Sequence, residues 1–157
     1  MKVRGWTVVA LAALIFSSCA GSGEGTGDQP PSVPPRDFTV EILVKGAGAG
    51  EWSGYKIDAN GTVKTFAIAG TTRTEMSQRQ LDAGTLRTIW QEARNSKVFD
   101  QDSMFSDGAS SHQMTVIANR RSYVYSWTPP GPKGSLTASL EKLFRFCVDA
   151  VRRKSTS

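Results

Sequence analysis

The first 36 residues have a composition that confines any folded domain to the part of the chain after them. Lys2 and Arg4 precede an uncharged segment, 5–18. Its apolar part, 6–16, is far shorter than the roughly 20 residues that a helix needs to cross a bilayer. A basic start, a short apolar middle and small residues after it are typical of a secretory signal. We therefore expect residues 1–18 to be an export signal that the mature protein lacks.

The next segment, 20–36, is rich in glycine, serine and proline and has no apolar periodicity. Gly/Ser-rich chains behave as flexible coils, and Pro-rich chains are stiffer and more extended. We expect 19–36 to be a tether, 37–153 to be a single globular domain, and 154–157 to be a short C-terminal tail. A domain of this length is large enough to bury a core of its own.

Cys19 has neighbours that define its chemistry. Phe16, Ser17 and Ser18 precede it, which resembles the lipobox of bacterial lipoproteins, where an apolar residue and two small residues precede an obligatory cysteine. The resemblance implies attachment of diacylglycerol to the Cys19 sulfur and cleavage after Ser18, often followed by N-acylation. Phe16 replaces the usual Leu. Two or three acyl chains hold a protein stably on a membrane. Because Ala20 rather than Asp follows the cysteine, the resemblance implies the outer membrane in a cell with two membranes, and otherwise the outer face of the cell membrane.

The second cysteine, Cys147, is left without an intramolecular partner if Cys19 carries lipid, so we expect no intramolecular disulfide. A single exported thiol can be reactive or can pair between chains. A small buried apolar side chain is the commoner role. Cys147 lies on the apolar side of a predicted C-terminal helix, and we therefore expect it to be buried. The oligomeric state stays open.

The charge of the chain argues against nucleic acid as a partner. The sequence has 19 Lys and Arg against 14 Asp and Glu, a formal charge of +5. Loss of residues 1–18 would remove Lys2 and Arg4 and leave +3. Both signs are interspersed, so the chain lacks the concentrated basic footprint of a nucleic-acid-binding domain.

Strand and helix periodicities alternate along the domain. Period-two alternation and turn residues predict five strands, at 38–44, 54–58, 62–68, 112–118 and 122–127. Asp58 and Gly61 bound a hairpin turn between the second and third strands. A last amphipathic helix begins near Ser135 and carries its apolar residues on one face. The order β-β-β-α-β-β-α predicts an α+β fold, with an antiparallel sheet of about five strands and both helices on one face.

The start of the first helix has two candidate positions. Ser77 and Gln80 have the spacing of a capping box, and Met76 and Leu81 have the spacing of a hydrophobic staple. Gly84 would then lie inside the helix, so a start near Asp82 is the alternative. Either helix ends near Asn95.

Two motifs of known enzymes are present only in part. The glycine run 46–50 leads into a predicted strand, so it lacks the helix N-terminus that a nucleotide-binding loop requires. Ser53 and Lys56 have the Ser-x-x-Lys spacing of penicillin-binding enzymes. In those enzymes the serine opens a helix, whereas a strand would place Ser53 and Lys56 on opposite faces.

The acidic and imidazole side chains also fall short of a metal site. Asp100, Asp102 and Asp107 are close in sequence, but Phe105 occupies the place where an EF-hand requires glycine. His112 is the single histidine and cannot form a zinc site alone. We therefore expect no catalytic residue, no metal ligand and no cofactor.

Aromatic residues are the best candidates for binding. Tyr123, Tyr125 and Trp127 share one face of a predicted strand, where they either pack in the core under the helices or grip a sugar or a peptide. Trp52 and Tyr55 follow the glycine run and would flank a loop at one end of the sheet, where partner contacts concentrate.

The domain also resembles a group of small exported bacterial domains that includes emfourin, a proteinaceous inhibitor of thermolysin-like metalloproteases. The resemblance covers about 38–150. It rests on the strand 38–44 leading into the glycine run, on the helix ending in Val98 and Phe99, on the hairpin 112–127 and on the closing helix. It implies a binding module and transfers no inhibitory residue.

Two classes of function follow from the sequence. The first is a non-catalytic binding domain of a lipid-anchored envelope protein, with an envelope protein or peptide as its partner. An emfourin-like protease inhibitor is a special case of it. The second is a small envelope hydrolase, for which polar residues around Asp107, Ser110 and His112 would have to form the site. We expect the first, because catalysis needs a nucleophile–base pair or a metal cluster.

Overall fold

A computed structural model describes residues 33–104, 110–130 and 135–153 of the chain. The elements follow in the order β1 (Thr39–Lys45), β2 (Glu51–Asp58), β3 (Thr62–Ala69), β4 (Thr72–Gln80), α1 (Ala83–Asn95), β5 (His112–Ala118), β6 (Arg121–Trp127) and α2 (Leu136–Arg152). The predicted export signal, Cys19, most of the tether, Asp107 and the tail at 154–157 lie outside the described residues. None of the described helices is both long enough and apolar enough to cross a membrane.

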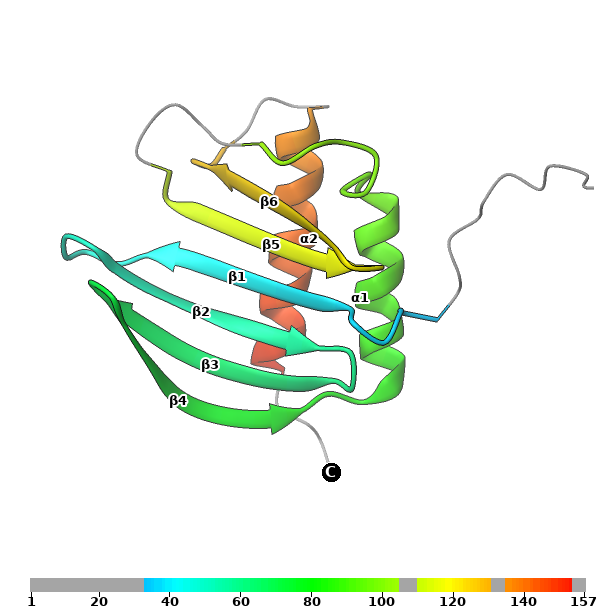
Figure 1. The fold of residues 1–157 in the computed structure, drawn as a ribbon, viewed down its shortest axis with the longest axis horizontal. Helices are drawn as coiled ribbons and strands as arrows, with labels where there is room; N and C mark the ends of the chain where they lie inside the picture. Colours follow the sequence, from blue (N-terminus) through cyan, green and yellow to red (C-terminus); the bar gives the residue numbers. More distant parts are fainter. Residues whose placement is uncertain (1–32, 105–109, 131–134, 154–157) are drawn as a thin grey trace, which may run out of the picture.

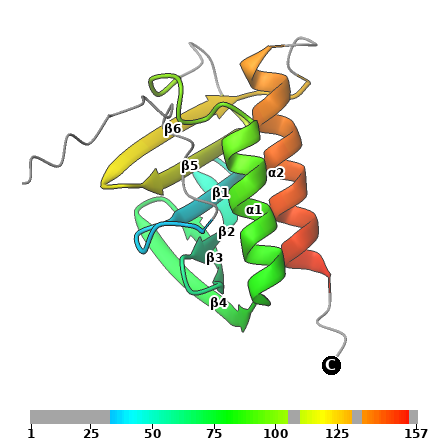
Figure 2. The same cartoon turned by 90° about the vertical axis from the view of Figure 1, so that its right-hand side faces the viewer.

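The strands form one antiparallel sheet in the order β4-β3-β2-β1-β5-β6 (Figure 1). Helices α1 and α2 lie side by side against one face of this sheet and leave the other face open (Figure 2). The predicted α+β class is confirmed, with six strands where the sequence predicted about five. We call the two surfaces of the sheet the covered face and the open face.

Strand alternation decides which residues enter the core. In the central strand β1, Val40 lies opposite Ile57 of β2 and Val116 of β5, and all three are fully buried under the helices. Helix α1 contributes Trp90, whose ring meets that of Phe38 edge to face at 5.0 Å. Burying one such large side chain contributes about 1.5–3 kcal/mol. The core is therefore a single layer between the covered face and the helices.

The extra strand, β4, corrects the sequence analysis. Residues 72–80 form a strand, so Ser77 is not a helix cap and Met76 is not part of a staple; Met76 is 68 % exposed. The alternative start is the observed one. Asp82 is the N-cap of α1, and its carboxylate accepts a hydrogen bond from the backbone N–H of Thr85 at 2.8 Å. The hydrogen bond from the Thr85 hydroxyl, followed by the one from the Thr85 backbone N–H, holds the pKa of Asp82 below its usual range.

Both predicted hairpin turns are present, and α2 begins where the sequence predicted it. Gly61 has φ +82° in the β2–β3 turn, a conformation that glycine adopts without strain. Asn119 and Arg120 have positive φ in the β5–β6 turn, where their N–H groups donate to the carboxylate of Asp37. The Arg120 N–H is the main reason why the pKa of Asp37 is lowered. Ser135 is the N-cap of α2, and its side chain accepts a hydrogen bond from the backbone N–H of Ala138.

Cys147 is fully buried on the inner side of α2, as predicted. Burial raises the pKa of its thiol to about 12. The thiolate is the reactive form of cysteine, so this thiol is a packing residue.

Candidate binding surface

The aromatic row of β6 belongs to the core. Tyr123, Tyr125 and Trp127 lie opposite Val116, Met114 and His112 of β5, so they point toward the helices. Tyr125 is fully buried and Trp127 is 2 % exposed, whereas Tyr123 is partly buried against them. Of the two roles expected for these residues, core packing and ligand binding, the structure shows core packing.

Tyr125 also has a polar partner inside the core. Its hydroxyl donates to the backbone carbonyl of Val98 at 2.6 Å, and burial raises its pKa to about 12. Val98 follows α1, so this bond ties the segment after the helix to β6. A buried tyrosine hydroxyl usually finds such a partner.

The other two aromatic candidates lie on opposite faces of the sheet. Tyr55 is opposite Ile42, on the covered face. Trp52 is opposite Lys45 and Ile68, on the open face. Both side chains are half-buried. The structure therefore does not bring Trp52 and Tyr55 together in one rim, and only Trp52 belongs to the surface that the helices leave free.

An apolar floor crosses the open face next to Trp52. Leu43, Gly54 and Phe66 are in register on β1, β2 and β3. Leu43 is 8 % exposed and Phe66 is 1 % exposed, although no helix covers them. A Cβ atom on Gly54 would lie 2.0 Å from the backbone oxygen of Ile42, so any other residue would force β1 and β2 apart at this point. Glycine is therefore required in the middle of the floor.

Arg73 of β4 covers Phe66. Its guanidinium carbon lies 3.4 Å from the centre of the Phe66 ring, which is a cation–π contact. The same guanidinium donates to the carboxylate of Glu41 on β1 at 2.9 Å. Strands β4 and β1 are three positions apart in a sheet whose neighbours are about 4.8 Å apart. The Arg73–Glu41 pair can therefore form only because β4 curls over the open face.

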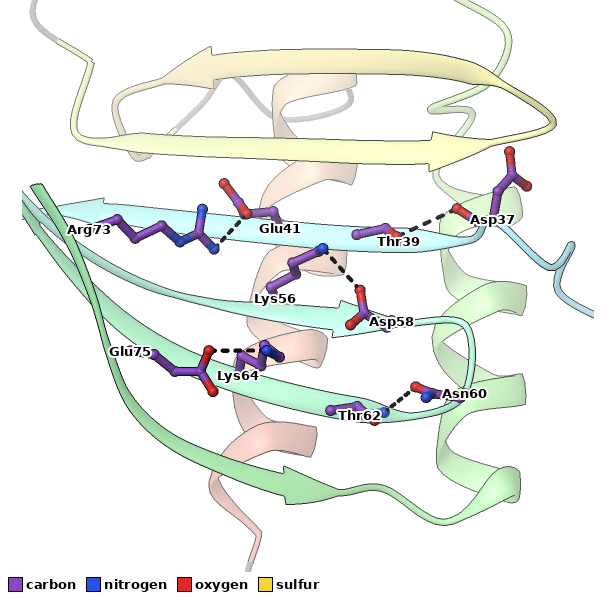
Figure 3. A network of polar contacts seen from close by, with 10 residues as sticks. All are labelled: Asp37, Thr39, Glu41, Lys56, Asp58, Asn60, Thr62, Lys64, Arg73 and Glu75. Atoms are coloured by element: carbon purple, nitrogen blue, oxygen red, sulfur yellow. Dashed lines mark hydrogen bonds and ion pairs between the residues drawn. The ribbon is translucent and has the colours of Figure 1, made fainter. Parts of the chain in front are cut away.

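A register shift in β4 accounts for this curl. The pairing of β3 with β4 slips between Thr65 and Phe66, leaving Met76 as the extra residue of a β-bulge. Bulges bend a strand and increase its twist. Figure 3 shows the Arg73 end of β4 rising toward β1, with the Arg73 side chain reaching Glu41.

Charged pairs surround the apolar floor. Besides Arg73–Glu41, Lys64 pairs with Glu75 at 3.0 Å and Lys56 pairs with Asp58 at 3.2 Å (Figure 3). A hollow of about 260 Å³ is lined by Glu41, Lys56, Lys64, Phe66, Arg73 and Glu75. The open face thus combines the half-buried Trp52, an arginine stacked on an aromatic ring, and three ion pairs. Tryptophan and arginine are the residue types that most often anchor protein interfaces.

The two edges of the sheet differ. At β6, the segment 103–104 supplies partners: the Met104 N–H donates to the Val124 carbonyl and the Ser126 N–H donates to the Met104 carbonyl, both at 2.9 Å. The Val124 N–H donates to the Ser103 hydroxyl at 2.9 Å. At β4, no strand in the described part of the chain pairs with the outer edge, and residues 72–78 are all exposed. Strand β4 therefore presents free backbone groups beside the open face.

The remaining chemical candidates among the described residues are not brought together. Ser53 and Lys56 lie on opposite faces of β2, as expected. His112 faces the core, where its ring packs at 4.8 Å against Phe144, and its Nδ1 atom forms a 2.9 Å hydrogen bond with the Ser111 hydroxyl. Burial lowers the pKa of His112, and Glu141 partly opposes this shift. In the described ranges, no group of three His, Cys, Asp or Glu side chains could hold a metal ion.

Sequence reasoning found Trp52 and missed Arg73, Phe66 and Met76. One signal for the missed strand was available: Gly70 lies between the predicted third strand and a threonine-rich run, and threonine favours strands. No protein-family model matches the sequence, and no curated protein matches it.

Proposed function

We propose that this chain is a lipid-anchored envelope protein whose domain is a non-catalytic binding module. We further propose that it binds an extended segment of an envelope protein along β4, with the open face as the adjoining contact surface. The observation that carries the second proposal is the outer edge of β4, to which no described residue bonds, in contrast with the bonded edge of β6. In β-strand addition the backbone of such an edge supplies affinity, and alternate side chains supply specificity.

The bulge and the side chains of β4 favour a different protein over a second copy of this chain. If two copies paired antiparallel with Met76 opposite Met76, the two bulges would meet and interrupt the ladder of hydrogen bonds between the copies. The bulge and the polar composition of β4 also discourage edge-to-edge association. These features disfavour pairing between the β4 strands of two copies, while the outer backbone groups of β4 stay available to a partner strand in a matching register.

The lipid anchor is supported by the sequence at 16–19 and can be tested directly. Labelled palmitate should enter the wild-type protein in cells and should be absent from Cys19→Ala, which should persist as an unprocessed precursor. Equal labelling of the two would overturn the anchor and leave the binding proposal unaffected.

The binding surface can be tested by a photo-crosslinking residue placed in living cells at Met76 or, as a matched exposed control, at Lys142 on α2. Met76 is 68 % exposed as a whole residue, and the Lys142 side chain is 79 % exposed. A probe at either position therefore reaches its surroundings. We expect a discrete protein adduct from position 76 that is absent from position 142. A synthetic peptide with the sequence of the crosslinked partner segment should then bind the purified domain along β4. Absence of an adduct at 76, or the same adduct at both positions, would contradict the proposal.

A hydrolase is the competing proposal, and the Ser111–His112 hydrogen bond is the observation that favours it. In the Ser-His-Asp arrangement one imidazole nitrogen faces the serine and the other donates to an orienting carboxylate. Among the described residues, the hydrogen bond of the His112 ring is to its own neighbour, and its ring packs on Trp127 and Phe144. Turnover of ester, peptide or glycoside substrates that disappears in His112→Ala would establish the hydrolase. Inhibition of a thermolysin-like protease would establish the emfourin-like branch.

A further inference from the structure

The outward side of α2 carries an excess of positive charge. Its exposed charged residues, including the C-cap, are Lys142, Arg145, Asp149, Arg152 and Arg153. Four of these five are cations. Two of these cations are ion-paired, Lys142 with Glu92 of α1 and Arg145 with Glu141 of α2. Helix α1 adds an exposed Arg87. We call Lys142, Arg145, Arg152 and Arg153 the basic stripe.

Helical geometry keeps the basic stripe on one surface. The spacing of positions 142, 145, 149, 152 and 153 follows the period of an α-helix. The opposite side of α2 is the apolar one that packs on the sheet, with Leu143 and Cys147 among its buried residues. Within the stripe, Lys142 lies beside α1, and Arg145 and Arg152 border a hollow next to Val44 and Tyr55 of the covered face. The stripe therefore lies on the helix side of the molecule (Figure 2), opposite the open face.

The open face of the sheet has no comparable excess. Its charged residues are Glu41, Lys45, Lys56, Asp58, Lys64, Arg73 and Glu75, and six of these seven form the three ion pairs described above. Counting every charged residue of α1 and α2 together with Arg153, the helix side has six cations and three carboxylates, against four cations and three carboxylates on the open face. The molecule is therefore more basic on the helix side than on the side that carries Trp52 and β4. A charge difference of this kind gives a small domain a preferred orientation over a charged plane.

We propose that the basic stripe lies against the anionic phospholipid headgroups of the membrane to which the chain is anchored, with β4 and the open face turned away from that membrane. The anchor rests on the proposed function, whereas the affinity of the stripe for anionic lipid does not. Each Lys or Arg near an anionic leaflet strengthens membrane binding about fivefold. A chain the length of 20–36 can extend to on the order of 50 Å, so the anchor itself would permit either face to approach the membrane. The charge difference selects the helix side.

The test uses the chain from residue 19 onward with Cys19→Ser, so that no lipid is attached. Binding is measured by cosedimentation with vesicles of phosphatidylglycerol and phosphatidylethanolamine, and with vesicles of phosphatidylcholine alone. Two double variants lose the same charge: Arg145→Gln with Arg152→Gln on the stripe, and Lys45→Gln with Lys64→Gln on the open face. Circular dichroism of each variant reports on its fold.

The wild-type chain should bind the anionic vesicles and not the neutral ones, and added salt should weaken this binding. The stripe variant should bind more than about tenfold less tightly, and the open-face variant should stay within about twofold of wild type. Lys142→Gln with Arg153→Gln provides a second stripe variant in case the first is unfolded. Lack of binding to the anionic vesicles, or equal losses in the stripe and open-face variants, would overturn the proposal. Because these chains carry no lipid, the palmitate experiment separately decides the anchor.

Discussion

The two edge strands of the sheet are built in opposite ways. Strand β6 places its aromatic side chains in the core and has its outer backbone bonded to the segment 103–104. Strand β4 has almost every side chain in solvent, and no described segment bonds to its outer backbone. In the described part of the chain, one edge is thus closed by the chain itself and the other is left open. An exposed edge is a liability that proteins usually cover or blunt. The bulge and the polar side chains of β4 blunt its edge against a second copy, and its outer backbone is where we propose that a partner strand binds.

Strand β4 is nevertheless held at both ends of its length. At its C-terminal end, the guanidinium of Arg79 donates to the backbone carbonyls of Ala150 and Arg153, each at 2.8 Å. These are terminal carbonyls of α2, which a cation there also stabilises through the helix dipole. At its N-terminal end, Arg73 packs on Phe66 and bonds to Glu41. The open edge is therefore positioned before any partner arrives.

The largest contrast should appear in stability. Tyr125→Ala in β6 removes a fully buried ring and should lower the free energy of unfolding by about 3 kcal/mol or more. Met76→Ala in β4 changes an exposed side chain and should stay within about 0.5 kcal/mol of wild type. Urea denaturation measures both. Similar losses in the two variants would mean that β4 is as much a part of the core as β6, and the comparison would fail.

A smaller effect separates Arg73 from the other cations of the open face. Arg73→Ala uncovers Phe66 and breaks the pair with Glu41, so it should cost about 1 kcal/mol. Lys64→Ala breaks only an exposed ion pair with Glu75 and should cost less than about 0.5 kcal/mol. Arg73→Lys keeps the charge but loses the planar stacking group. If the lysine variant is as stable as wild type, charge rather than stacking holds the end of β4.

The smallest expected effect is a pH dependence of stability that comes from His112, the first residue of β5, whose ring packs against α2. Burial lowers the pKa of folded His112 below the usual 6.5, so the unfolded chain takes up the proton first as pH falls. The free energy of unfolding should therefore decrease as pH drops through 6.5 toward the lower pKa of the folded protein. Denaturation above and below pH 6.5 should show a weaker pH dependence in His112→Gln. An unchanged dependence in that variant would place its origin elsewhere.

The sequence predicted the covered half of this comparison far better than the open half. The alternation in β6 and the apolar side of α2 repeat with clear periods because each buries one face, and burial is what imposes a period. Both faces of β4 are in solvent, so 72–80 has no period to detect. Met76, Ser77 and Gln80 then have the spacing of a helix start, which led to the wrong element.

The candidate surface was predictable only in part for a similar reason. Trp52 could be found as an aromatic residue beside a glycine-rich loop, and the strand period alone already separates it from Tyr55. The burial of Phe66 depends on Arg73, which reaches it because a bulge bends β4. A bulge is a tertiary feature of strand pairing and leaves no pattern in the sequence of 72–80.

Amide hydrogen exchange tests the open edge most directly. In the free chain, the outer amides of β6 at Val124 and Ser126 should be protected by Ser103 and Met104. Alternate amides of β4, those that point away from β3, should exchange without protection, and they should become protected when the peptide identified by crosslinking at Met76 is added. If those β4 amides are already protected in the free chain, or if the peptide leaves them unprotected, β4 is not the binding edge.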